Sequence, residues 1–469
     1  MRQESHTGEA VPDVEPTGSR PRSRVTLHGL LAKRVFYPIN LWQKRIHPRD
    51  LREFCARDEW SREHLRECQR QGLRQLLIYA AAQCPYYRQS FERLGVRPAA
   101  NDPFSELPKF PPMTKTDVRA NLDQLFSNEF KARKGLIKKA TGGSGGRPLV
   151  VWGDFEDYRQ NGLVIARQRR WVGWEGGMKT LNIFGGFRDL QSVITRTAKR
   201  WLINETLVNN MARENGDYDR LAERLLKAPP EAIIAYFSSL RELARALEKK
   251  KRPLAGVKVV IACAEPLDER GRRHAEQWLG TPVYFQYGCR ELGALGQECR
   301  EQAGYHYPQD VCYCEVLDDR GEPADQGHLT ITHLGNRVVP LIRYQIGDGA
   351  SLDNSPCHCG LPHLRLKSID GRISSMITTP GGQLLTSMIF PHVFKDYPWI
   401  LEFQVEQTYV NRLEVRVKRD APMFSETSRQ ELEAKVLGLL GRDMAISWRF
   451  DEPFVPVPTG KHVYFVSRL

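Results

Sequence analysis

Residues 232–291 decide the fold of this chain and read AIIAYFSSLRELARALEKKKRPLAGVKVVIACAEPLDERGRRHAEQWLGTPVYFQYGCRE. Short apolar runs alternate here with amphipathic stretches, a pattern that predicts strands alternating with helices. The predicted strands span 232–237, 257–263 and 283–287, and the predicted helices span 240–250 and 267–279. Such alternation is typical of parallel βαβ units with right-handed crossovers. The sequence therefore predicts an α/β domain.

The residues that directly follow these predicted strands are candidates for ligand contact. Ligands of parallel sheets bind beyond the carboxyl ends of the strands. These positions are Ser238 and Ser239 after the first strand, Ala264 to Pro266 after the second, and Gly288 to Glu291 after the third. We expect them to line one edge of the sheet.

The C-terminal part of the chain has a different pattern. Residues 402–408 and 413–418 alternate between apolar and polar side chains, which predicts two antiparallel strands. An amphipathic helix over 427–440 and a strand over 445–450 follow. The sequence therefore predicts a compact α+β module at this end.

We expect the chain to divide into a disordered tail over 1–24, a large domain over 25–370 and a small domain over 371–469. The tail is polar with little apolar content. Residues 25–42 are apolar apart from Lys33 and Arg34. We expect this segment to pack on the large domain as a helix or loop, and a peripheral position on a membrane surface is the alternative.

The composition excludes several classes of protein. The 469 residues include 69 Lys and Arg against 56 Asp and Glu, a net charge of +13 that is spread along the chain. No zinc-finger spacing, RNA-binding signature or basic region with heptads is present, so we expect no nucleic-acid partner. No apolar run of about 18 residues occurs and the N-terminus has no apolar core, so neither a spanning helix nor a signal peptide is expected. We expect a cytoplasmic protein with reduced cysteines.

A loop rich in glycine occupies residues 138–151, KKATGGSGGRPLVV. Glycines let the backbone curl so that several N–H groups point at one anion, while hydroxyls and a guanidinium add donors and charge. The pattern is typical of a phosphate-binding loop, and equally of a glycine-rich hairpin without a ligand. The candidate residues are Thr141, Gly142, Gly143, Ser144, Gly145, Gly146 and Arg147.

Three further motifs follow this loop in order: YGCRE at 287–291, RYQIGD at 343–348 and PTGKHVYFVS at 458–467. The ordered series resembles the signature motifs of adenylate-forming enzymes, namely acyl-CoA synthetases, peptide-synthetase adenylation domains and luciferases. Within that superfamily the chain is most similar to the phenylacetate–CoA ligase branch, which includes CapK-type proteins. The stretches AEPL at 264–267 and AAAQCPYYRQSF at 80–91 support this resemblance, which spans roughly residues 60–469.

The resemblance implies a large α/β domain followed by a small, mobile α+β domain. It also implies an enzyme that couples a carboxylic acid to ATP as an acyl-adenylate and then transfers the acyl group to CoA or to an amine. The glycine loop would hold the β- and γ-phosphates, and Tyr287, with Gly288 beside it, would pack near the adenine. Asp348 would bind the ribose hydroxyls with Arg372 nearby.

Three residues of the series are candidates for catalysis. Glu291 would hold Mg²⁺ and Lys461 would reach the α-phosphate and the reacting carboxylate, so that positive charge offsets two approaching anions. Arg290 stands where the family usually carries a Ser or Thr, and could bind phosphate or pair with Glu291. Serines at 374 and 375 replace the usual hinge Asp. These departures leave a non-catalytic nucleotide- or acyl-binding protein as the alternative.

The acid would lie between the strand ends, and the aromatic side chains there would suit an aryl acid. The candidate substrate contacts are Phe184, Tyr236, Ser238 and Ala264.

Cysteines and histidine form a second constellation in the sequence. Some relatives in the phenylacetate–CoA ligase branch carry a structural zinc in this region, and the resemblance implies a tetrahedral site here. Its ligands would be Cys299, His306, Cys357 and Cys359. Cys312 and Cys314 are the rival pair, since two residues apart on a strand they share one face. We expect that pair to pack in the core.

Overall fold

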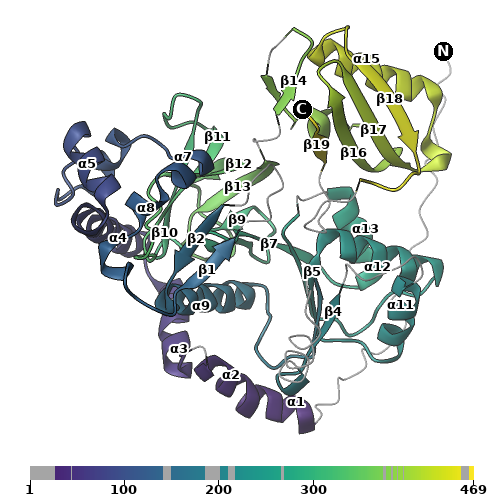
Figure 1. Cartoon of the computed structure of the whole chain (residues 1–469). Coiled ribbons are helices and arrows are strands. Elements are labelled where there is room, and N and C mark those ends of the chain that lie inside the picture. Colours follow the sequence, from purple (N-terminus) through teal and green to yellow (C-terminus); the bar gives the residue numbers. More distant parts are fainter. Residues whose placement is uncertain are drawn as a thin grey trace, which may run out of the picture.

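The computed structural model describes residues 27–43, 45–140, 149–184, 201–209, 217–265, 269–372, 376–381, 384–387, 389–394, 396–455 and 464–469. An 11-stranded sheet forms the body of the protein, and a four-stranded sheet forms a separate C-terminal unit (Figure 1). The strand order of the large sheet is β10-β11-β12-β13-β9-β8-β7-β6-β5-β3-β4.

One half of the large sheet is parallel; the sequence predicts its strands β5, β6 and β7 but not β3 or β4. Its strands are β3 (Thr180–Phe184), β4 (Glu205–Asn209), β5 (Ala232–Tyr236), β6 (Val259–Cys263) and β7 (Val283–Cys289). Helices α12 (Phe237–Lys249) and α13 (Glu269–Leu279) connect β5 to β6 and β6 to β7. The central strands β5 and β6 are buried on both faces, which explains why they appear in the sequence as continuous apolar runs.

Helix α12 begins three residues before its predicted start at Leu240. The Ser238 backbone N–H donates to Glu265 Oε2 at 2.5 Å, and the Ser238 hydroxyl donates to Glu265 Oε1 at 2.9 Å. A carboxylate at a helix N-terminus satisfies free N–H groups and interacts favourably with the helix dipole. Because Glu265 belongs to another strand end, only the tertiary structure sets this start.

The other half of the large sheet is antiparallel and was not predicted. Its strands are β8 (Gly293–Glu298), β9 (Tyr305–His306), β10 (Cys312–Leu317), β11 (Gln326–His333), β12 (Tyr344–Asp353) and β13 (Arg365–Arg372). A short hairpin of β1 (Ile137–Ala140) and β2 (Val150–Gly153) flanks the glycine loop.

Helices of the N-terminal part pack around the large sheet (Figure 1). Helix α4 (Arg62–Gln83) ends before Cys84, and Pro85 starts the next helix at once, because proline suits a first helical turn. The helices here are α1 (Leu27–Leu31), η1 (Ala32–Phe36), α2 (Tyr37–Gln43), α3 (Pro48–Ala56), η2 (Arg57–Glu59), α4, α5 (Pro85–Leu94), α6 (Pro103–Glu106), η3 (Leu107–Lys109), α7 (Lys115–Ala120), α8 (Leu122–Leu125), η4 (Asn128–Phe130), α9 (Phe155–Trp171) and α11 (Asp217–Lys227).

The apolar segment predicted over 25–42 is helical from Leu27 and packs on the body through buried Ala32 and Leu41. Lys33 of this segment forms an ion pair with Glu175 of the body. None of the helices in the described ranges is long and apolar enough to span a bilayer.

The C-terminal unit has its own apolar core. Its main strands are β16 (Ile400–Tyr409), β17 (Arg412–Arg419), β18 (Ala445–Phe450) and β19 (Phe465–Ser467), in the order β18-β17-β16-β19. The predicted antiparallel pair is β16 and β17, and the predicted helix is α15 (Glu426–Leu440). The smaller elements are β14 (Met376–Thr378), β15 (Leu384–Thr386), α14 (Ile389–Phe394) and η6 (Ala421–Met423). The predicted boundary at 370/371 lies inside β13, and the predicted tail over 1–24 lies outside the described residues.

The C-terminal unit contacts α12 through a cluster of charged side chains. Glu402 Oε1 lies 3.2 Å from Arg241 Nε and 3.7 Å from Arg245 Nη2, while Glu402 Oε2 lies 2.9 Å from Lys418 Nζ. Burial raises the pKa of Glu402, but Arg241, Arg245 and Lys418 outweigh it and lower the pKa to about 2. Glu402 is therefore a charged anchor between the two parts of the chain.

Candidate active site

Two of the predicted motifs meet through one hydrogen bond. The Tyr287 hydroxyl donates to Asp348 Oδ2 at 2.5 Å, although β7 and β12 are separated by three other strands in the sheet. Burial first, and then the negative charge of Asp348, raises the pKa of Tyr287 well above its usual value. The phenol therefore remains a donor, and the two side chains form one polar edge of the site.

Glu291 lies in the turn between β7 and β8 and is 3% exposed. The Tyr344 hydroxyl donates to Glu291 Oε1 at 3.0 Å, and Lys115 Nζ lies 3.7 Å from the same oxygen. Lys139 Nζ contacts the Glu291 backbone carbonyl oxygen at 3.4 Å. Carboxylate oxygens are the ligands that hard divalent cations prefer, so Glu291 has the chemistry to hold one.

Lys115 was missed by the sequence prediction. It is the first residue of α7, whose start is set by a capping box between Thr114 and Asp117. The signal available in the sequence was the Thr-x-x-Asp spacing that predicts this helix start. Nothing local indicates that the helix start faces Glu291.

Arg290 is exposed in the same turn. Within the described part of the chain it forms no ion pair with Glu291, whose cationic neighbour is Lys115. The geometry therefore disfavours the reading in which Arg290 neutralises the metal ligand. Gly288 is required by the tight approach of the hairpin, because an added Cβ would lie 2.5 Å from the Gly293 carbonyl oxygen.

The predicted substrate contacts lie at the same edge of the sheet. The rings of Phe184 and Tyr236 meet edge to face with centroids 5.2 Å apart. Ser238 is engaged by Glu265, as described above, and Ala264 is exposed with a left-handed backbone at φ 68°. A left-handed non-glycine residue at a strand end is uncommon and marks a sharp change of chain direction.

Several predicted residues lie outside what the structure describes. They are the glycine-loop residues from Thr141 to Pro148, the hinge serines at 374 and 375, and Lys461. The backbone of Arg372 pairs with that of Asp348 between β13 and β12.

Cys299, His306, Cys357 and Cys359 come together, as the resemblance implies. Their ligand atoms all lie within 4.8 Å of one another. The Sγ atoms of Cys299 and Cys357 are 3.7 Å apart, and Cys359 Sγ is 3.3 Å from His306 Nε2. Tetrahedral Zn²⁺ with Zn–S bonds of about 2.3 Å requires Sγ–Sγ separations of about 3.8 Å. The donor set and its spacing therefore fit one zinc ion.

The rival pair Cys312 and Cys314 is buried in the main core with its sulfur atoms 3.9 Å apart. Across the described ranges, the only group of three or more ligand-type side chains is the one around His306. This agrees with the expectation that Cys312 and Cys314 pack in the core.

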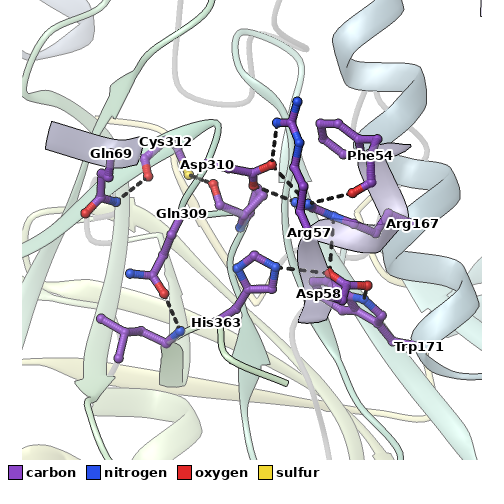
Figure 2. Close-up of polar contacts among 12 residues, drawn as sticks. Phe54, Arg57, Asp58, Gln69, Arg167, Trp171, Gln309, Asp310, Cys312 and His363 are labelled. Atoms are coloured by element: carbon purple, nitrogen blue, oxygen red, sulfur yellow. Dashed lines mark hydrogen bonds and ion pairs between the residues drawn. The ribbon is translucent and has the colours of Figure 1, made fainter. Parts of the chain in front are cut away.

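A polar network around Asp58 and His363 (Figure 2) supports the His306 side of this cluster through the His363 carbonyl group. His306 Nδ1 lies 2.7 Å from the His363 carbonyl oxygen, and His363 Nε2 lies 3.2 Å from Asp58 Oδ1. Trp171 Nε1 donates to Asp58 Oδ2 at 2.7 Å. Burial lowers the pKa of His306 to about 4, which keeps the ring neutral. A neutral ring that donates from Nδ1 presents its Nε2 lone pair to the three thiols.

The same network contains a fully buried ion pair. Arg167 donates to Asp310 through Nη2 at 2.7 Å and Nη1 at 3.0 Å, and Arg57 Nη1 donates to the same carboxylate at 3.0 Å (Figure 2). The side chains of Arg167 and Asp310 are both 0% exposed. Neither these residues nor Asp58 were predicted, because they are far apart in the sequence and lack a local pattern.

No family model matches the chain. The structure superposes on 2-hydroxyisobutyryl-CoA ligase in the postadenylation state, in complex with R3-HIB-AMP, with a TM-score of 0.66 and 21% identity over 85% of this chain and 88% of that one. The chain has the fold of an adenylate-forming ligase.

Sequence comparison agrees with this fold. Phenylacetate-coenzyme A ligase of Thermus thermophilus is 27% identical over 395 residues, covering 80% of this chain and 86% of that protein. Protein CapK of Staphylococcus aureus is 23% identical over 339 residues, covering 70% of this chain and 73% of that protein. The resemblance drawn from the ordered motifs is therefore confirmed.

Proposed function

We propose that this protein is an AMP-forming carboxylate ligase. It would activate a carboxylic acid with ATP as an acyl-adenylate, release pyrophosphate, and transfer the acyl group to CoA or to an amine. The observation that carries this proposal is the Tyr287–Asp348 hydrogen bond, which joins two motifs into one nucleotide-side edge. The names of the sequence relatives, phenylacetate-coenzyme A ligase above all, support the same reaction class.

The chain supplies the groups that this reaction needs. Attack of a carboxylate on an α-phosphate brings two anions together, so the barrier falls when positive charge is already in place. Glu291 would hold Mg²⁺, which neutralises phosphate charge when it is bound. Asp348 would orient the ribose, the glycine loop from Thr141 would bind the phosphates, and Lys461 would contact the α-phosphate.

Acid-dependent ATP–pyrophosphate exchange over a panel of carboxylic acids tests this proposal. We expect exchange with at least one acid, near-complete loss of exchange in Lys461→Ala, and little change in ATP binding by that variant. Lys435→Ala serves as the control, since Lys435 is an exposed lysine of the same C-terminal unit. Absence of exchange with every acid would refute the ligase assignment.

A non-catalytic binding protein on the same fold is the alternative. It rests on Arg290, which replaces a hydroxyl of the motif, and on the hinge serines. The exposed position of Arg290 away from Glu291 favours a phosphate contact instead. Arg290→Thr should then lower exchange activity by raising its activation free energy by about 1.5–3 kcal/mol, the usual contribution of a hydrogen bond to a charged group. A clear gain of activity would support the alternative.

We also propose that the cluster of Cys299, His306, Cys357 and Cys359 holds a structural Zn²⁺. Four protein ligands leave no open position for substrate, which is typical of structural zinc. Elemental analysis should find about one zinc per chain, and X-ray absorption should find three sulfur ligands and one nitrogen ligand. Cys357→Ser should lower zinc content and thermal stability, whereas Cys312→Ser should leave zinc content unchanged. Metal-free protein whose melting is insensitive to chelator would refute the site.

A further inference from the structure

Four side chains form a row across the parallel half of the large sheet. Tyr236 pairs with Cys263, and Cys263 with Gln286, in the strand registers. Phe184 is the strand-end neighbour of Tyr236, because Ile183 pairs with Ala235 one position earlier. The side chains of these neighbours point to the same face of the sheet. The rings of Phe184 and Tyr236 are in contact, and Cys263 Sγ lies 3.9 Å from Gln286 Oε1. We call these four residues the acid-side row.

The acid-side row lies on the opposite face of the sheet from the nucleotide-side residues. Gln286 directly precedes Tyr287 in β7, so their side chains point to opposite faces. Tyr287 turns to Asp348 on one face. The acid-side row lies on the other face. An acid substrate that holds its reacting carboxylate at the strand ends would extend along this row.

Helix α9 lies over the Gln286 end of this row. Arg169 Nη2 lies 3.5 Å from Gln286 Oε1, and Gln286 Nε2 lies 3.5 Å from Gln168 Oε1. The Arg169 guanidinium is also 5.5 Å from the centre of the Trp174 ring. A cation and two amides therefore meet at the end of a row that begins with two aromatic rings.

Two donor atoms at this end, Arg169 Nε and Gln168 Nε2, have no acceptor in the described part of the protein. Arg169 forms no ion pair with any described carboxylate, and its Nε is buried without a hydrogen-bond acceptor. Gln168 is 0% exposed, and its Nε2 has no partner either. Arg167, two residues earlier on α9, also has a buried Nε without a hydrogen-bond acceptor, but its Nη1 and Nη2 both donate to Asp310, so its charge is paired with a carboxylate. Buried polar atoms are nearly always hydrogen-bonded, so unsatisfied donors beside a substrate site indicate an acceptor on the ligand.

We propose that Arg169 binds a second anionic group at the far end of the acid substrate, with Gln168 as an additional donor. This inference rests on the proposed ligase function and defines its substrate class. The preferred acids carry a second carboxylate or a comparable anionic group, in contrast to the plain aryl acid that the aromatic residues alone indicate. A guanidinium binds a carboxylate through two parallel hydrogen bonds, and the contact is strong because both groups are charged.

Matched pairs of acids test the proposal in the exchange assay. Glutarate is compared with pentanoate, and terephthalate with 4-methylbenzoate, for the wild type, Arg169→Met, Arg169→Gln and Arg170→Met. Arg170 is the exposed neighbour and serves as the control. We expect the wild type to favour at least one dicarboxylate at least tenfold in kcat/KM. Both Arg169 variants should lose that preference through KM, whereas Arg170→Met should keep it.

Calorimetric titration of the same acids without ATP separates this inference from the proposed function. Dicarboxylate binding that Arg169→Met abolishes supports the anion site even if no exchange occurs, in which case only the ligase assignment fails. Exchange that favours the monocarboxylates, or an equal effect of Arg169→Met on both members of each pair, overturns the anion site and leaves the ligase assignment intact. Absence of both exchange and binding overturns both.

Discussion

Asp310→Ala should strongly destabilise the large domain. The substitution leaves the Arg167 guanidinium, which is 0% exposed, without the two hydrogen bonds of 2.7 and 3.0 Å that neutralise it. Removing one partner of a buried ion pair costs about 3–5 kcal/mol. Asp58 Oδ1, 3.7 Å from Arg167 Nε, remains as a weaker partner and favours the lower end of that range. A loss of about 3 kcal/mol changes the folding equilibrium on the order of a hundredfold.

Urea unfolding followed by tryptophan fluorescence measures this loss, since Trp171 lies in the same network. The control is Glu53→Ala, which removes an exposed ion pair with Arg49 and should change stability by less than about 0.5 kcal/mol. The double substitution Arg167→Met with Asp310→Leu should be less destabilising than Asp310→Ala, because no unpaired charge stays buried. Equal stability of Asp310→Ala and the wild type would refute the reasoning.

The same ion pair predicts the acid sensitivity of the domain. Burial alone raises the pKa of Asp310, but the Arg167 guanidinium outweighs it and holds that pKa well below its usual range. A carboxylate with a depressed folded pKa stabilises the fold fully above its unfolded pKa of about 3.9. This contribution should therefore be lost as the pH falls below about 4. The urea midpoint of the wild type should then fall relative to that of the double variant Arg167→Met/Asp310→Leu, which lacks the ion pair.

Three further predictions concern other parts of the molecule. Glu402→Gln should weaken the contact between the C-terminal unit and α12 and increase the radius of gyration in small-angle scattering, whereas Glu414→Gln, whose ion pairs stay within that unit, should not. Tyr287→Phe removes a hydrogen bond to a carboxylate and should reduce kcat/KM for ATP by roughly tenfold or more, with unchanged unfolding as the sign of a local effect. Gly288→Ala should destabilise the protein because the new Cβ meets backbone, while Gly438→Ala, with open space in a helix, should stabilise it by up to about 1 kcal/mol in thermal unfolding.

The sequence by itself determined strands β5, β6 and β7 of the parallel half of the large sheet, and strands β16 to β18 and helix α15 of the C-terminal unit. Strands buried on both faces appear as short apolar runs, as at 259–263, and half-buried strands alternate, as at 413–418. Both patterns reflect the burial of the strand itself, so they can be recognised in the sequence without knowing the partner strands. The ordered motifs likewise predicted that Tyr287 and Asp348 belong to one site, and the resemblance supplied all four ligands around His306.

Only the tertiary structure decided which side chains meet across the fold. Three contacts between distant segments show this. Lys115 lies beside Glu291, Arg167 is buried against Asp310, and Arg169 lies beside Gln286. Arg167 and Arg169 stand two positions apart on α9 but have different environments: Arg167 is paired with Asp310 in the core, whereas Arg169 contacts Gln286 of the acid-side row. The sequence shows that both residues are charged, but it does not show which groups surround them. The strength of an ion pair depends on the distance between the two charges, and the packing of α9 against the rest of the fold sets that distance.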